Sequence, residues 1–139
     1  EKNAELLNFW KQMIAFRKAH PILHPEEELR ILDTLSCGYP DLSYHGQNAW
    51  RPQTESYNRH VGMMYCGKYA MDETGSDEAD MYIAYNMYWE EQSFGIPSAR
   101  NKRKWKVAFS TSPNQKSEEV GRTFNVPGRS ITVLIAKPE

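Results

Sequence analysis

The feature that most constrains this chain is a single amphipathic helix placed ahead of a long stretch of strand-like sequence. Large apolar residues recur at intervals of three and four positions between Ala4 and Ala19, as one face of a helix requires. Pro21 ends the pattern, because it lacks a backbone N–H and disfavours helical geometry at the preceding residue. The pattern predicts a mainly β chain, with residues 1–20 as a separate helical unit and residues 21–139 as a β domain.

The predicted helix carries a wide apolar face. Asn3 is expected to cap its N-terminus, with the side-chain oxygen accepting a backbone N–H bond. One helix cannot bury such a face alone, so it must dock on the following domain, on a missing neighbour, or on both. A lone helix ahead of a β domain suggests a piece of a larger protein. The apolar face consists of Leu6, Leu7, Trp10, Met13, Ile14 and Phe16.

The rest of the chain alternates between short strands and turn residues. The clearest strand is 81–88, where both faces carry large groups, so it is predicted to be central. In the 104–109 segment, strict alternation would place Trp105, Val107 and Phe109 on one face. Leu29–Leu35 is predicted to be a short strand or a helical turn. Six to eight short strands predict an antiparallel β-sandwich with Greek-key-like connections.

Composition excludes several classes of function. A chain of 139 residues with 40% hydrophobic and 25% charged residues is typical of one globular domain. A net charge of -1 gives no general attraction to nucleic acid or to an anionic membrane, and no apolar run reaches the length of a membrane helix. Cys37 and Cys66 fit free thiols in a reducing cytoplasm better than one disulfide, which remains the alternative.

No catalytic motif stands out, and the sequence predicts no cofactor and no metal. The four histidines and two cysteines show no zinc-ligand spacing, so a zinc site would require them to be gathered by the fold. The acidic 72–80 segment could bind Ca²⁺, but a solvated hairpin tip is the favoured interpretation. The basic residues between Arg100 and Lys104 could contact phosphate or glycan, and a charged turn is favoured there.

The 41–52 segment is the least ordinary part of the β domain. It mixes aromatic, imidazole and amide groups outside any regular strand, and such a loop is costly to order unless it packs on something. A contact between domains is favoured over direct ligand binding. The candidate contact residues in and beyond this segment are Tyr44, His45, Trp50 and Trp89.

Four segments, in this order, resemble the C-terminal region of bacterial glycogen debranching enzymes of the isoamylase/pullulanase type, in the α-amylase superfamily. "LLNFWKQMIAFRKAHPIL" is similar to the last helix of that family's catalytic barrel, with its Arg-x-x-His-Pro ending. "PDLSYHGQNAWRP" is similar to the segment that follows it. "DMYIAYNMYWEEQSFGIP" and "VPGRSITVL" are similar to a strand pair and to the closing strand of the β-sandwich. The resemblance covers nearly the whole chain.

The resemblance implies a parent enzyme that hydrolyses α-1,6 branch linkages through three barrel carboxylates. Those carboxylates precede the last helix, so no Asp or Glu of this chain inherits their roles, and the chain alone is expected to be inactive. Its implied role is to stabilise the missing barrel of the same parent chain through Leu7, Trp10 and Ile14, and to contact an α-glucan.

Two alternatives remain open. The first is a free-standing carbohydrate-binding module, in which Tyr44, Trp50, Tyr88 or Trp89 stack on sugar rings. The second is a protein-interaction domain unrelated to sugars that uses the helix. Coplanar exposed aromatic rings would favour the first alternative. A large apolar surface continuous with the helix would favour either the debranching-enzyme reading or the second alternative.

Overall fold

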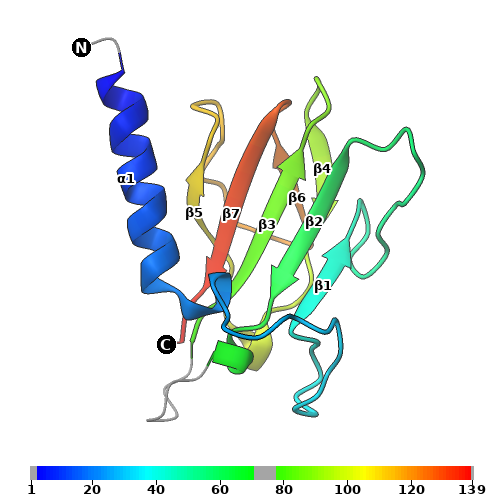
Figure 1. The fold of residues 1–139 in the computed structure, drawn as a ribbon. Coiled ribbons are helices and arrows are strands. Elements are labelled where there is room, and N and C mark those ends of the chain that lie inside the picture. The colour runs from blue at the N-terminus through cyan, green and yellow to red at the C-terminus, as the bar shows by residue number, and fades with distance from the viewer. Residues whose placement is uncertain (1–2, 71–77, 139) are drawn as a thin grey trace.

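The computed structural model describes residues 3–70 and 78–138, which form one helix beside a two-layered β structure (Figure 1). Helix α1 spans Ala4–Ala19, as the apolar periodicity predicts, and His20 ends it with an extended backbone. A short 3-10 turn, η1 (Pro21–Leu23), follows at once and buries Ile22 completely. The helix is therefore joined to the β structure by a short, anchored connection.

The larger layer is an antiparallel sheet with the strand order β1-β2-β3-β7-β5, and the smaller layer pairs β4 with β6 behind it (Figure 1). β3 is flanked by β2 and β7, which confirms the central position predicted for the 81–88 segment. The seven strands found in the described residues confirm a mainly β sandwich preceded by a helix. They are β1 (Leu42–His45), β2 (His60–Tyr65), β3 (Asp80–Asn86), β4 (Gln92–Gly95), β5 (Lys106–Ser110), β6 (Thr123–Val126) and β7 (Ser130–Ala136).

The main core lies between the two sheets and is built from alternate residues of the strands. Tyr82 and Ala84 of β3 are fully buried there. Phe94 of β4 and Phe124 of β6 close the core from the smaller sheet. The Tyr82 hydroxyl donates to the carbonyl oxygen of Gly95 at 3.2 Å, so this polar group has a partner inside the core.

Strand β5 departs from the predicted alternation. Val107 pairs with Leu134, but Phe109 pairs with Val133, so the register shifts by one residue between them. A bulge of this kind turns the next side chain to the other face of the sheet. Trp105 and Val107 pack into the core, whereas Phe109 lies on the outer face and meets rings of the helix. The prediction that these three side chains share one face is therefore wrong.

A buried ion pair closes one end of the sandwich. The Asp80 carboxylate lies 2.7 Å from Nε of Arg100, and both side chains are buried. The same carboxylate accepts the backbone N–H groups of Gly67 and Arg100 at 2.9 and 3.1 Å. The Glu78 carboxylate binds the His20 ring at 3.0 Å, which connects the end of the helix to this cluster. Arg100 is thus a structural residue rather than part of a solvated basic turn.

Only the last part of the acidic 72–80 segment belongs to the described residues. Asp72, Glu73 and Asp77 lie outside the described residues. Glu78 and Asp80, which are described, are tied into the fold by His20 and Arg100 and do not form a solvated hairpin tip.

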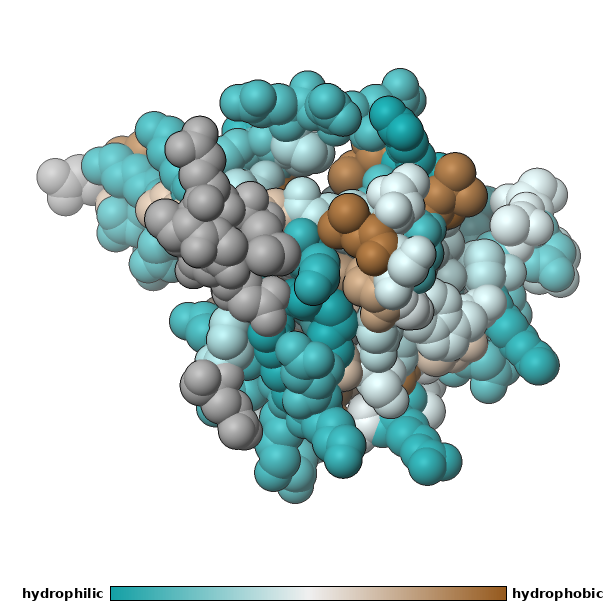
Figure 2. Space-filling model, turned by 90° about the horizontal axis from the view of Figure 1, so that it is seen from below, coloured by the Kyte–Doolittle hydropathy of each residue, from teal (hydrophilic) through white to brown (hydrophobic). Residues whose placement is uncertain are grey.

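The Leu29–Leu35 segment is neither a strand nor a helical turn, which corrects the prediction. Its backbone N–H groups at Arg30 and Ile31 donate to the Asp41 carboxylate at 2.7 and 2.8 Å, so a side chain replaces a strand partner. The segment leaves apolar side chains in solvent, and Figure 2 shows brown apolar groups among hydrophilic ones at this end of the molecule. The exposed residues are Ile31, Leu32 and Leu35.

Two smaller expectations concern single side chains. The Asn3 side chain makes no capping bond, and instead the Asn3 carbonyl accepts the N–H of Leu7 at 2.9 Å. The predicted side-chain cap is therefore wrong. Cys37 and Cys66 are free thiols in the structure, and burial raises the pKa of the Cys66 thiol to about 12.

Candidate functional site

Trp50 presents an aromatic ring on a strained loop. Its backbone is in the left-handed region, with φ 65°, which costs a residue other than glycine about 1–2 kcal/mol. Its side chain is 46% exposed. The Trp50 backbone N–H donates to Nδ1 of His45 at 2.8 Å, and this bond holds the loop in its strained form. Strain of this kind is tolerated where the surroundings fix the conformation, and it is common at binding sites.

His45 supports Trp50 from below the surface. Its side chain is fully buried, and its ring packs against Trp50 at 4.7 Å and against Tyr82 at 5.6 Å between ring centroids. Because Nδ1 accepts the Trp50 N–H, Nε2 carries the proton and donates to the Ser43 hydroxyl at 2.8 Å. Burial lowers the pKa of His45 to about 4, so the ring stays neutral near pH 7. His45 thus positions Trp50 and does not itself reach a ligand.

The loop that carries Trp50 is also held against the smaller sheet. The Gly95 N–H of β4 donates to the Gly46 carbonyl at 2.9 Å. A Cβ atom at Gly95 would lie 2.2 Å from the backbone nitrogen of Ala49, so only glycine permits this approach. The loop is therefore backed by His45 on one side and by β4 on the other.

The predicted candidate residues do not form one site. Tyr44 alternates with the inward-facing His45 on β1, so it lies on the outer face of the large sheet, where it is 37% exposed. Trp89 is 64% exposed in the turn between β3 and β4, and its ring neighbour is Tyr88 at 5.7 Å. The structure brings only His45 and Trp50 together.

Sequence reasoning missed Tyr39, which extends the Trp50 surface. The Tyr39 ring lies 6.1 Å from the Trp50 ring, with 47° between their planes, and its hydroxyl donates to the Ser98 carbonyl at 3.0 Å. The glycine and proline beside Tyr39 predict a turn over residues 37–41 and no further role for its ring. The only sequence signal for Tyr39 was an aromatic residue between a glycine and a proline. The two tilted rings do not form a flat, coplanar platform.

The second candidate surface is the free part of α1. Phe9 and Phe16 meet the Phe109 ring edge-on at centroid distances of 6.3 and 5.1 Å, and these contacts dock the helix. No helix residue is fully buried. At about 100° per residue, the predicted barrel-facing residues lie about 100° or more round the helix from Phe9. These residues, Leu7, Trp10 and Ile14, are 54%, 56% and 51% exposed.

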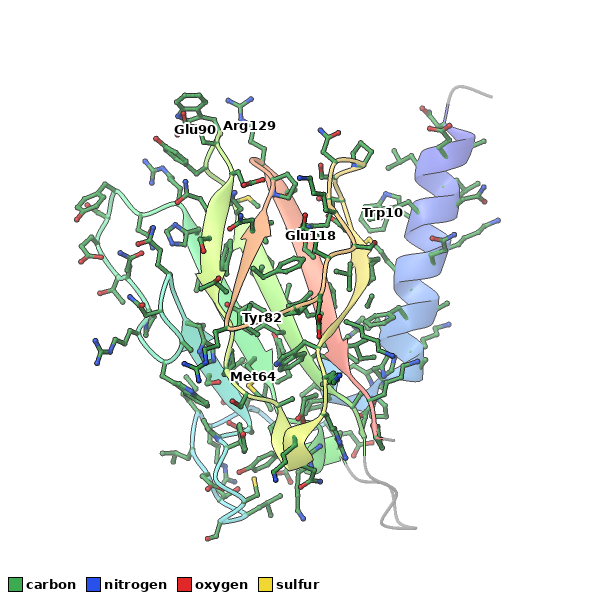
Figure 3. The ribbon with its side chains drawn as sticks, turned by 180° about the vertical axis from the view of Figure 1, so that it is seen from behind. Trp10, Met64, Tyr82, Glu90, Glu118 and Arg129 are labelled. Carbon is green, nitrogen blue, oxygen red and sulfur yellow. The ribbon has the colours of Figure 1, made fainter. Side chains whose placement is uncertain are left out.

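Figure 3 shows Trp10 on the flank of the helix, next to the β structure and above the region where the two meet. Its ring nonetheless keeps more than half of its surface in solvent. The β domain thus covers one edge of a wide apolar face and leaves the remainder open. An uncovered row of Leu, Trp and Ile is typical of a surface that a partner covers.

The described residues hold no group of three His, Cys, Asp or Glu side chains that could bind a metal ion. Among the helices described, none has the length and apolar character needed to cross a membrane. No known family profile matches the sequence, and no curated protein matches it. Any assignment of function therefore depends on the two surfaces and on the resemblance in the sequence.

Proposed function

We propose that this chain is a non-catalytic accessory domain of an α-glucan debranching glycoside hydrolase that acts on α-1,6 linkages. In this proposal, residues 1–20 are the last helix of a catalytic barrel and residues 21–139 form the β-sandwich that stabilises it. The barrel supplies the catalytic carboxylates, and this chain supplies none.

The observation that supports the proposal is the division of the helix face. Phe9 and Phe16 pack on the β domain, while Leu7, Trp10 and Ile14 are each more than half exposed. A helix that belonged only to this β domain would bury its whole apolar face against it, since that burial is the main gain from docking. The exposed part of the helix face is thus suited to a second partner, and the resemblance implies that this partner is a catalytic barrel.

A second candidate function is direct contact with α-glucan at Trp50 and Tyr39. Two neighbouring rings, one of them held in place by His45, offer a rigid apolar surface next to solvent. This arrangement supports glucan binding either by the domain within its parent or by a free-standing module. Titration with a branched maltooligosaccharide, followed by amide NMR, should shift Trp50 and Tyr39. Glucan contact is refuted if millimolar ligand leaves these signals unchanged.

The first proposal is tested in the complete parent protein with the pair Leu7→Asp and Ile14→Asp. Charges in a buried helix face should lower the thermal stability of the parent and reduce its hydrolysis of pullulan. The control pair is Asn8→Asp and Ala15→Asp, which adds the same charge at exposed positions about 100° round the helix from Leu7 and Ile14. Equal behaviour of the two pairs would contradict a barrel on this face. In the isolated chain, neither pair should matter much.

A further inference from the structure

A large cavity among the described residues lies between the start of β5 and the 117–122 segment that leads to β6. Its volume is about 1060 Å³. One wall is formed by the 101–107 segment, and the other includes Glu118, which Figure 3 shows on the connection crossing the back of the molecule. This volume lies just above the range for small-molecule sites, about 300–1,000 Å³.

The cavity concentrates positive charge in a chain whose net charge is -1. Five cationic side chains line it against two carboxylates, Glu118 and Glu119. Lys116 lies 3.7 Å from Glu118 and offsets part of that negative charge. Within the described part of the chain, no carboxylate forms an ion pair with four of the cations. These four are Lys102, Lys104, Lys106 and Arg122.

The backbone that carries these cations is held in an unusual form. Asn101 and Lys102 are consecutive residues in the left-handed region, with φ 54° and 57°. The segment is fixed on one side by the Arg100–Asp80 ion pair and on the other by Arg103, which donates to the Glu78 carbonyl at 3.1 Å. The strained turn is therefore rigidly anchored, and Lys102 within it and Lys104 just after it are presented from a fixed backbone.

The interior of the cavity limits the type of anion. Tyr39, Val107 and Val120 are partly buried and give it an apolar surface. Trp105 is only 7% exposed, and its indole N–H is used by the Pro97 carbonyl at 2.7 Å, so it offers no free face for a nucleobase. The two carboxylates, which would repel a polyphosphate, can accept hydrogen bonds from hydroxyl groups.

We infer that this cavity binds a sugar phosphate. The phosphate group meets the lysine and arginine cluster, while the sugar ring lies over the apolar surface and donates hydroxyl bonds to Glu118 or Glu119. Charge-assisted bonds from Lys and Arg are the strongest available to a phosphate monoester. The ligand could be a free sugar phosphate or a phosphorylated residue of a glucan chain, since both present the same chemical group. This inference does not depend on the proposed role in debranching.

The test is an amide NMR titration of this chain at constant ionic strength with glucose 6-phosphate, glucose and inorganic phosphate as separate probes. Glucose 6-phosphate should shift signals in the 101–107 and 117–122 segments, and it should bind more tightly than either of the other probes. Its affinity should fall as salt is added, because exposed charges are screened.

A charge variant gives the second readout. The pair Lys104→Gln and Arg122→Gln removes two exposed cations and should weaken glucose 6-phosphate binding about tenfold or more, the effect of losing one charged hydrogen bond. The control pair, Lys11→Gln and Lys18→Gln, removes the same charge from α1 and should leave the affinity unchanged. Both pairs alter exposed side chains, and the spread of amide signals verifies that each folds.

Three results would overturn the inference. Absence of localised shifts would mean that the cavity binds no sugar phosphate. Equal affinity for inorganic phosphate would reduce it to a non-selective anion surface. An unchanged affinity in the Lys104 and Arg122 variant would place the binding elsewhere. If the site is confirmed, comparing glucose 6-phosphate with a phosphorylated maltooligosaccharide distinguishes the two sources of the ligand.

Discussion

Trp10→Ala tests how the apolar face of helix α1 is divided between the edge that packs on the β domain and the part open to solvent. The Trp10 ring is neither buried in a core nor fully exposed. In the isolated chain Trp10 is 56% exposed, whereas Trp105 is 7% exposed. Truncating a buried Trp in a core costs about 3–5 kcal/mol. The two tryptophans therefore predict very different costs from the same chemical change.

The expected cost for Trp10 follows from the area that it buries. A fully buried aromatic side chain removes about 150–250 Å² of surface from water. Trp10 buries less than half of its surface, and this area at about 25 cal/mol per Å² is worth about 2 kcal/mol. The higher helix propensity of alanine returns about 0.5 kcal/mol. We expect Trp10→Ala to lower the free energy of unfolding by about 1–2 kcal/mol. Trp105→Ala should cost about 4 kcal/mol or more, since it also orphans the Pro97 carbonyl.

The assay is urea unfolding of the isolated chain, followed by far-ultraviolet circular dichroism so that removal of a tryptophan does not alter the probe. The change in midpoint, with an unchanged slope, gives the change in unfolding free energy. Equal costs for Trp10→Ala and Trp105→Ala would refute the reasoning. They would mean that Trp10 belongs to the core of this chain and that its helix face is not available to a partner.

Three further predictions concern the interior. The imidazole of His45, followed by NMR, should titrate near pH 4. The free energy of unfolding should fall by up to about 3 kcal/mol as the pH drops from about 6.5 toward 4, because the unfolded state takes up the proton first. Titration near 6.5 would contradict the burial of this ring. Asp80→Asn should cost about 3–5 kcal/mol in urea unfolding, since it removes the carboxylate charge that faces the buried Arg100. A cost below about 1 kcal/mol would show that the ion pair is dispensable. Gly95→Ala should displace the loop beside it and shift the Trp50 amide signal, because the added Cβ would meet backbone at 2.2 Å; an unchanged spectrum would contradict this close approach.

The regular elements were predictable because their patterns are local. The periodicity of apolar residues between Ala4 and Ala19 and the following Pro21 predict the observed helix at both ends. Alternation and the Pro127–Gly128 turn likewise predict β6 and β7 with their observed bounds. Each of these signals depends on residues within a few positions of one another.

The bulge in β5 could not be predicted in this way. Nothing in the sequence between Lys106 and Ser110 breaks the alternation, yet the register shifts so that Phe109 meets Phe9 and Phe16. The shift depends on a helix that is about ninety residues away in the chain. Tertiary packing of this kind overrides local strand propensity.

The candidate site was predictable only in part. The unusual composition of the 41–52 segment pointed to Trp50, but it could not show that His45 is buried beneath it or that Tyr39 lies beside it. The buried partnership of Asp80 with Arg100 was missed for the same reason. Asp80 lies in an acidic segment and Arg100 in a basic one, and only the fold determines which residue of each segment is buried.

The central claim, that the open face of α1 belongs to a second domain, is tested most directly by amide hydrogen exchange of the helix in two settings. One is this chain alone, and the other is the longer parent protein that we propose, in which a catalytic barrel adjoins the helix. We expect the Leu7–Ile14 amides to exchange quickly in the isolated chain and to be protected by at least about tenfold in the parent, because packing on a partner stabilises the helix. The β3 amides serve as an internal reference and should be protected in both. Equal exchange of the helix in the two settings would contradict the account.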